Sequence, residues 1–190
     1  MSDWLAGRRA EAAAERILDS AADLFTRHEA ATVGMNDIAA AAGCSRATLY
    51  RYFESRDVLF TAYVHRETHR LFAEIGTELS TTTDPHRRVV EGALAALHKV
   101  RENPALASWF AGTARPVGAE WADRSAVIAA LAQAFLAAMG DRSELELRAR
   151  WLVRQLISLL QFPGRDDAEE RLMLERFVAP HVVAPARTAH

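Results

Sequence analysis

The side chains with the clearest chemistry in this sequence lie in one short stretch, residues 45–56. The side chains expected on the exposed face of a helix there are those of Arg46, Thr48, Tyr50, Arg51 and Tyr52. A guanidinium group can donate two hydrogen bonds to guanine, and Thr and Tyr hydroxyls can reach phosphates or base edges. On an exposed helix face, Lys and Glu would serve solubility better than aromatic and hydroxyl residues. This composition therefore favours contact with double-stranded DNA over a plain solvated surface.

Two short helices are expected to position these side chains. Met35–Ala42 is rich in alanine and has strong helix propensity, and Gly43 can end it in the left-handed conformation. Ser45 follows as a candidate N-cap for a second helix, Arg46–Tyr52. Two helices joined by a tight glycine turn form a helix-turn-helix, in which the second helix enters the major groove. An ordinary helical hairpin with a polar surface is the alternative interpretation.

The inner face of this pair is expected to be apolar. Leu49 and Phe53 lie four residues apart, so they share one side of the second helix. With Ile38 and Ala39 they would hold the helices together.

Several short motifs here resemble the DNA-binding signature of the TetR family of bacterial repressors. They are Ile38-Ala39, Ala42-Gly43-Cys44-Ser45, Thr48-Leu49-Tyr50-Arg51-Tyr52-Phe53 and Ser55-Arg56-Asp57-Val58-Leu59-Phe60. The resemblance covers residues 10–63, about a third of the chain. Two positions depart from it, because Gly34 stands where the family has a Thr or Ser cap, and Cys44 replaces a small aliphatic residue.

The resemblance implies particular roles for the candidate residues. Arg46, Ala47, Tyr50 and Arg51 would face bases, while Ser45, Thr48, Tyr52 and Arg56 would meet phosphates. It also implies a homodimer in which the last two helices of each subunit pair with their twins, and a small-molecule effector site in the C-terminal part.

Bulk composition predicts an all-α protein. Half of the 190 residues are hydrophobic, alanine dominates, and no segment alternates polar and apolar residues. One cysteine excludes an internal disulfide framework and fits a reducing cytosol. No apolar stretch is long enough to span a bilayer and no signal-peptide core is visible, so we expect a cytoplasmic protein without membrane association.

The charge balance supports DNA binding only locally. The net charge is -2, and residues 1–60 hold seven Arg and no Lys against nine Asp and Glu. From Cys44 to Arg56, however, three arginines stand against Glu54 alone. A DNA-binding protein needs positive charge where the phosphates lie, rather than over the whole domain.

The remaining sequence predicts a series of helices around this pair. The expected segments are 10–28, 58–79, 85–102, 104–111, 121–139, 143–162 and 166–178, the sixth beginning with a capping box at Ser143–Glu146. Residues 1–54 would form the DNA-binding domain, and residues 55–190 a larger helical domain for effector binding and dimerisation. The helix after Ser55 would run from one domain into the other.

The helix at residues 143–162 is apolar on more than one face, which predicts burial against a second subunit. The expected dimer interface comprises Leu145, Ala149, Leu152, Val153, Leu156, Leu160, Leu174 and Phe177. A buried central helix within one subunit is the alternative.

Aromatic and apolar residues in the middle and late helices are candidates for an effector pocket. They are His98, Trp109, Phe110, Trp121, Phe135, Met139 and Trp151. Plain core packing is the competing interpretation for each. No phosphate-binding glycine loop, cysteine cluster or nucleophile elbow is present. We therefore expect no enzymatic activity, no cofactor and no metal.

These observations predict a DNA-binding regulator, most simply a ligand-responsive repressor that binds a palindromic operator as a dimer. An activator of the same fold is one alternative. A helical small-molecule-binding or sequestering protein without specific DNA binding is another.

Overall fold

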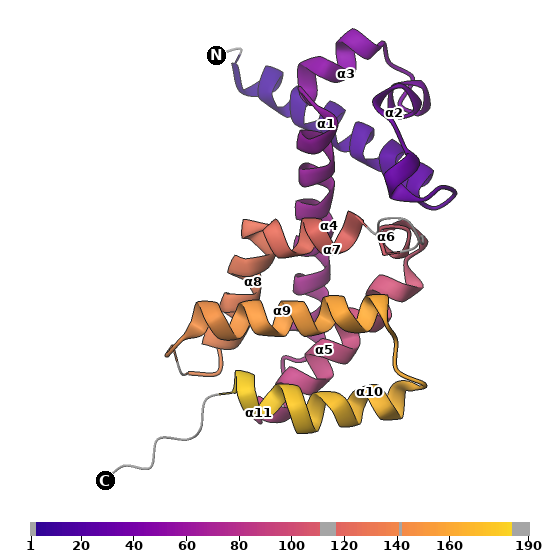
Figure 1. Ribbon diagram of the computed structural model, residues 1–190. Helices are drawn as coiled ribbons and strands as arrows, with labels where there is room; N and C mark the ends of the chain where they lie inside the picture. The colour runs from indigo at the N-terminus through magenta and orange to yellow at the C-terminus, as the bar shows by residue number, and fades with distance from the viewer. Residues whose placement is uncertain (1–2, 111–116, 141, 184–190) are drawn as a thin grey trace. The chain divides into compact units, whose positions relative to one another are not determined.

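The computed structural model describes residues 3–110, 117–140 and 142–183, which are helices joined by turns and loops without strands (Figure 1). This confirms the expected all-α fold. The helices are α1 (Asp3–Phe25), η1 (Ala30–Thr32), α2 (Met35–Ala41), α3 (Arg46–Tyr52), α4 (Arg56–Glu78), α5 (Pro85–Glu102), α6 (Pro104–Ala107), α7 (Val117–Arg124), α8 (Ala126–Ala137), α9 (Leu145–Gln161), α10 (Asp167–Met173), η2 (Leu174–Val178) and α11 (Ala179–Val182).

The chain divides into two compact units. The first contains residues 1–66 and 103–117, and the second contains residues 67–102 and 118–190. The first half of α4 and the segment around α6 therefore belong to the same compact unit as residues 1–54. Sequence patterning does not reveal that a distant segment returns to complete the core of this unit.

An aromatic cluster fills the centre of the first unit. Phe25 from α1 meets Phe60 and Tyr63 from α4 edge-on, with ring centroids 5.3 and 4.9 Å away. Trp109, which follows α6, stacks on Tyr63 at 5.6 Å with an interplanar angle of 7°. Trp109 is only 3% exposed. This tryptophan is thus buried in the core of the first unit, which favours the core-packing interpretation given for it above.

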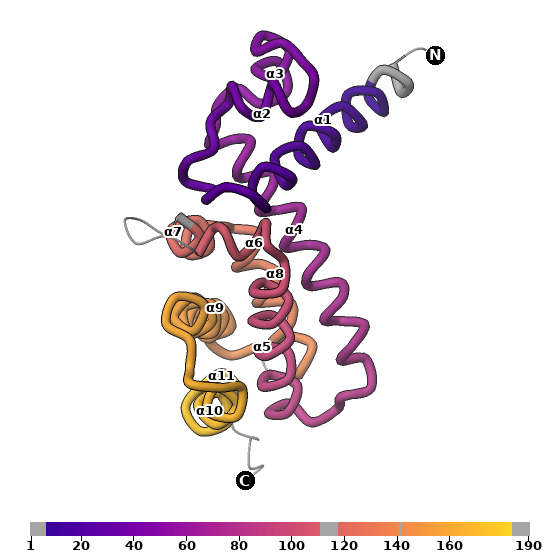
Figure 2. The backbone as a smooth tube through the Cα atoms, turned by 90° about the vertical axis from the view of Figure 1, so that its right-hand side faces the viewer, coloured from indigo at the N-terminus to yellow at the C-terminus, as the bar shows by residue number. Residues whose placement is uncertain are grey.

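The core of the second unit is built from α5, α8, α9 and the segment from α10 to α11. Its buried members are Val89, Val90, Ala93, Leu94, Ala132, Leu136, Ala149, Leu152, Leu174, Val178, Ala179 and Val182. Gly92 allows α5 and α8 to approach closely, because a Cβ at this position would lie 2.8 Å from the Phe135 ring. The tube view in Figure 2 shows α5 running beside the C-terminal segment, in agreement with their contacts.

Two helix boundaries differ from the sequence-based prediction. The single helix expected at residues 121–139 is two helices, α7 and α8, because Ser125 caps α8 by accepting a hydrogen bond from the Ile128 amide at 3.2 Å. The N-cap residue of α9 is Glu144, one position after the expected Ser143, and it has a φ of 48° and no side-chain cap bond.

The loop between α9 and α10 is fixed by a buried ion pair. Glu170 accepts hydrogen bonds from both terminal nitrogens of Arg101 at 2.8 and 2.7 Å, and from the Gly164 amide at 2.9 Å. These bonds hold the pKa of Glu170 below its usual range, although burial opposes the shift. Among the described residues, no helix combines the length and apolarity needed to cross a membrane.

Candidate DNA-binding site

The turn between α2 and α3 has the geometry that its residues require. Gly43 adopts a φ of 64°, in the left-handed region that favours glycine. The Cys44 amide donates to the Ala39 carbonyl at 3.0 Å and closes the end of α2. Ser45 then caps α3, because its hydroxyl accepts from the Thr48 amide at 3.1 Å. The predicted helix-turn-helix connection is therefore confirmed at the level of individual bonds.

The start of α2 is held despite the missing cap side chain at Gly34. The Asp37 carboxylate accepts a hydrogen bond from the Gly34 amide at 2.9 Å. This is one half of a capping box, and the negative charge also lies favourably at the N-terminus of a helix.

The inner face of the pair is buried as expected. Ile38 and Leu49 are fully buried, and Ala39 and Phe53 are exposed by 5% or less. This packing orients α3 so that its opposite face is accessible (Figure 1).

The outer face of α3 carries the candidate base-reading groups. Arg46, Ala47, Tyr50 and Arg51 are exposed, while Thr48 and Tyr52 are half-buried. The Arg46 guanidinium donates to the Tyr50 hydroxyl at 3.4 Å and lies 5.3 Å from the centre of its ring. Arg51 lies in the same way 5.4 Å from the Tyr52 ring. The two arginines rest on neighbouring aromatic rings, which limits their mobility without removing them from solvent.

Arg56 occupies a different place from the expected phosphate contact. Its Nε donates to the Val33 carbonyl at 2.9 Å, and its Nη2 donates to the carbonyls of Ala30 and Ala31 at 3.0 and 2.9 Å. The guanidinium also lies 4.2 Å from the centre of the Phe60 ring. The structure thus directs Arg56 into its own domain, where its guanidinium donates to three backbone carbonyls in and after η1.

The expected effector-site residues divide between the two compact units. Trp109 and Phe110 belong to the first unit, whereas the other five lie in the second. Phe135 and Met139 pack on the core of the second unit, and Trp151 is 45% exposed. Trp121 is half-buried.

His98 lines an open groove of about 530 Å³ between α4, α5 and α10. Most of the groove is charged, with Glu78, Lys99, Glu102 and Arg171 among its lining residues. It therefore differs from the mostly apolar pocket expected for an effector. His98 instead approaches the Asp167 carboxylate at 3.1 Å.

The expected dimer residues divide into two groups. Ala149, Leu152 and Leu174 are buried in the core of their own unit, and Leu145, Val153 and Leu156 pack against that core. Leu160 is half-buried and Phe177 is 65% exposed. The other large apolar residues exposed in this region are Leu147, Trp151, Phe162, Leu172 and Met173. When a helix has two apolar faces, its sequence does not show which face packs in the core of its own chain.

Comparison with known proteins agrees with the geometry of this site. Residues 17–63 match the model of the bacterial regulatory proteins of the tetR family. The chain is 56% identical over 190 residues to the HTH-type transcriptional regulator Rv1255c of Mycobacterium tuberculosis, with 99% of this chain and 94% of the relative covered.

Two solved structures share the fold. The TetR family repressor AlkX from Dietzia sp. aligns with a TM-score of 0.66 at 23% identity, covering 88% of this chain and 93% of that one. RolR in complex with resorcinol aligns with a TM-score of 0.70 at 18% identity, covering 94% and 97%.

A helix-turn-helix with an exposed α3 on an all-helical chain defines the class of DNA-binding transcriptional regulators. This chain belongs to the TetR family within that class. Its relatives are regulators rather than enzymes, in line with the absence of catalytic motifs from the sequence. Within residues 3–110, 117–140 and 142–183, no group of three or more His, Cys, Asp or Glu is placed to hold a metal ion.

Proposed function

We propose that this protein is a ligand-responsive repressor that binds a palindromic operator as a homodimer. The observation that carries the proposal is the exposed outer face of α3, on which Arg46 and Tyr50 form a prealigned pair. In this arrangement Arg46, Ala47, Tyr50 and Arg51 face the base edges, while Ser45, Thr48 and Tyr52 contact phosphates. Arg56 is left out of the phosphate-contacting set because three backbone carbonyls occupy its guanidinium.

The proposed dimer uses the exposed apolar side of α9 and of the segment from α10 to η2. Leu147 and Trp151 lie one turn apart on α9, and Phe162 directly follows its end. Met173 and Phe177 lie one turn apart on the next segment. Exposed apolar patches of this kind are typical of protein-protein interfaces. Two α3 helices about 34–36 Å apart would then enter successive major grooves of one operator.

The proposed effector is a small organic molecule that binds in the second unit. The relative RolR has been solved with resorcinol, which supports a ligand site in this fold. To relieve repression the effector must bind the state that is incompetent for DNA more tightly, because equal affinity for both states shifts no equilibrium. A tilt of α4 would then move the two α3 helices out of register. The proposed place of action is the cytoplasm, where a bacterial chromosome lies.

Selection of bound fragments from sheared genomic DNA would test the proposal. We expect one or a few short palindromic sites, with affinity that falls steeply as salt rises. Transcription from the neighbouring promoter should increase when the gene for this protein is deleted, whereas a decrease would identify an activator. Recovery of random fragments only would contradict specific DNA binding and favour a ligand-sequestering protein. Titration with small molecules at a fixed operator concentration would test the effector.

A further inference from the structure

The position of Arg56 gives it a task within the DNA-binding unit. The segment that it holds, residues 30–33, connects α1 to the helix-turn-helix, and Val33 directly precedes Gly34, the N-cap of α2. The guanidinium thereby fixes the point from which α2 departs. Burial lowers the pKa of Arg56, and the neighbouring Asp57 carboxylate opposes that shift. Arginine stays charged under such conditions, so its three acceptors remain satisfied at any physiological pH.

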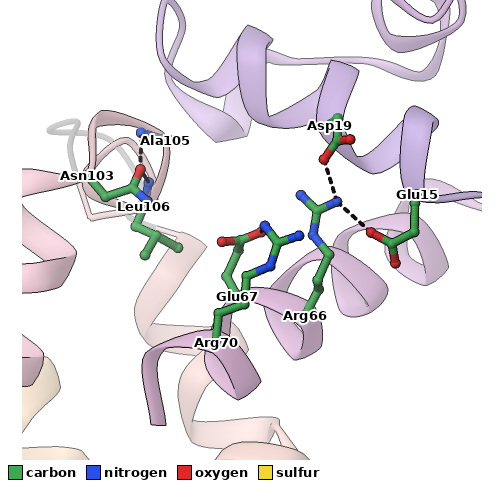
Figure 3. Close-up of polar contacts among 8 residues, drawn as sticks. All are labelled: Glu15, Asp19, Arg66, Glu67, Arg70, Asn103, Ala105 and Leu106. Atoms are coloured by element: carbon green, nitrogen blue, oxygen red, sulfur yellow. Dashed lines mark hydrogen bonds and ion pairs between the residues drawn. The ribbon is translucent and has the colours of Figure 1, made fainter. Parts of the chain in front are cut away.

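A second arginine on α4 holds α1 in a similar way. Nη1 of Arg66 lies 3.1 Å from a carboxylate oxygen of Glu15 and 2.8 Å from one of Asp19, as Figure 3 shows. The Arg66 side chain is only 10% exposed and also lies over the Tyr63 ring at 5.7 Å. Glu15 and Asp19 are themselves exposed, so solvent and salt weaken this contact more than they weaken the contact at Arg56.

The two arginines bracket the part of α4 that belongs to the DNA-binding unit. Arg66 lies ten positions after Arg56, which is about 15 Å along the helix axis. Between them lie Leu59, Phe60 and Tyr63, all at 1% exposure or less. Arg66 is also the last residue of α4 that belongs to the first compact unit. The first half of α4 is therefore attached at Arg66 to α1, and at Arg56 to the segment 30–33 that leads into α2.

We propose that Arg56 is a positioning residue for operator recognition, which together with Arg66 clamps the first half of α4 to α1 and to the start of α2. This inference rests on the proposed function. Arg56 acts through backbone carbonyls on the angle at which α2 and α3 are presented, and it does not touch phosphate. Arg66 supplies the second, more salt-sensitive point of the clamp.

The difference between arginine and lysine makes the proposal testable. A guanidinium reaches three carbonyls with a planar fork of donors, whereas an ammonium group is a compact point charge on a flexible stem. Lysine is a good phosphate ligand, so it can replace arginine at a phosphate contact. Arg56→Lys therefore keeps the positive charge and removes the planar set of N–H donors that reaches the three carbonyls.

The main experiment measures the affinity of Arg56→Lys for the selected operator and for a scrambled duplex over a range of salt concentrations. We expect operator affinity to fall about tenfold or more, from the loss of charge-assisted hydrogen bonds, while affinity for the scrambled duplex stays unchanged. The slope of log K against log salt should also stay unchanged, because no phosphate contact is lost. Arg16→Lys, at an exposed position on α1, is the matched control and should match the wild type.

A second measurement separates positioning from simple loss of stability. Hydrogen exchange without DNA should speed up at the amides of residues 30–42 in Arg56→Lys. Val89→Ala, in the core of the second unit, should lower the melting temperature without changing operator affinity of the folded protein. A double-mutant cycle of Arg66→Ala and Asp19→Ala should show coupling that decreases at high salt.

The outcomes distinguish this inference from the proposed function. Wild-type protein that fails to bind any operator would overturn the proposed function. Wild-type protein that binds while Arg56→Lys binds equally well would overturn only the positioning role. A loss of about one unit of salt slope in Arg56→Ala, restored in Arg56→Lys, would show that Arg56 contacts phosphate.

Discussion

The two units of this protein differ in how clearly the sequence separates the exposed face of a helix from its buried face. In the first unit, each polar side chain on the outer face of α3 has a partner on the same helix or a clear path to solvent, and the apolar positions form one buried face. In the second unit, α9 has apolar residues on two sides, and only one side packs within the chain. A local motif thus defines the exposed face of α3. The exposed face of α9, by contrast, depends on which of its two apolar sides packs against other helices of the same chain.

The largest effect is expected from the exposed apolar side of the second unit. Phe177→Asp would place a charge in the proposed interface, so the protein should become monomeric but stay folded. Loss of the second α3 helix removes the gain from two linked binding events, and operator affinity should fall by about 10²–10⁴-fold. Light scattering and DNA titration would measure both effects. A stable dimer in this variant would place the interface elsewhere.

The buried side of the same segment should respond differently. Leu174 is fully buried within its own unit, so Leu174→Ala should lower the free energy of unfolding by about 2–5 kcal/mol. At temperatures where this variant is folded, it should still dimerise. Chemical denaturation together with light scattering tests the prediction, and a monomeric but fully stable variant would assign Leu174 to the interface after all.

An intermediate effect is expected on the outer face of α3. Arg46→Ala should reduce affinity for the operator by about 1–3 kcal/mol and relax the preference at one base-pair position in each half-site. Competition with single-substituted operators measures both quantities. Equal loss on every sequence would show that Arg46 contacts only phosphate.

The smallest effect concerns the pH dependence of stability at the ion pair between Arg101 and Glu170. The pKa of Glu170 is lowered in the folded protein, so its contribution to stability is present above its ordinary value of 4.5 and is lost as pH falls below that value. Glu170→Gln cannot titrate, so its stability should change less than that of the wild type as pH falls. Identical profiles from pH 6 to pH 3 for the two proteins would contradict this assignment.

The sequence predicts the helix-turn-helix well because the signals there are local. Gly43 in the left-handed conformation, the Ser45 cap and the burial of Leu49 depend on residues within a few positions of each other. The same reasoning does not predict the hydrogen bonds of Arg56 to backbone carbonyls, because these acceptors lie 23 to 26 residues earlier in the chain. Charge and position alone predict a phosphate contact for this arginine.

Longer-range packing explains the remaining differences. The sequence does not predict that Trp109 stacks on Tyr63 in the first unit. The sequence shows that α9 is apolar on more than one face, but it does not show that Leu152 is buried in its own core while Trp151 is exposed. Neither assignment follows from periodicity, because both depend on which segments meet in the folded chain.

The central claim is that the exposed side of α3 reads an operator. The most direct measurement is the stoichiometry and affinity of binding to the selected palindromic duplex, for wild-type protein and for Arg46→Ala, beside a scrambled duplex of equal length. We predict two chains per duplex, strong preference for the palindrome, and a preference that decreases in Arg46→Ala. Equal affinity of wild-type protein for both duplexes at low salt would contradict the account.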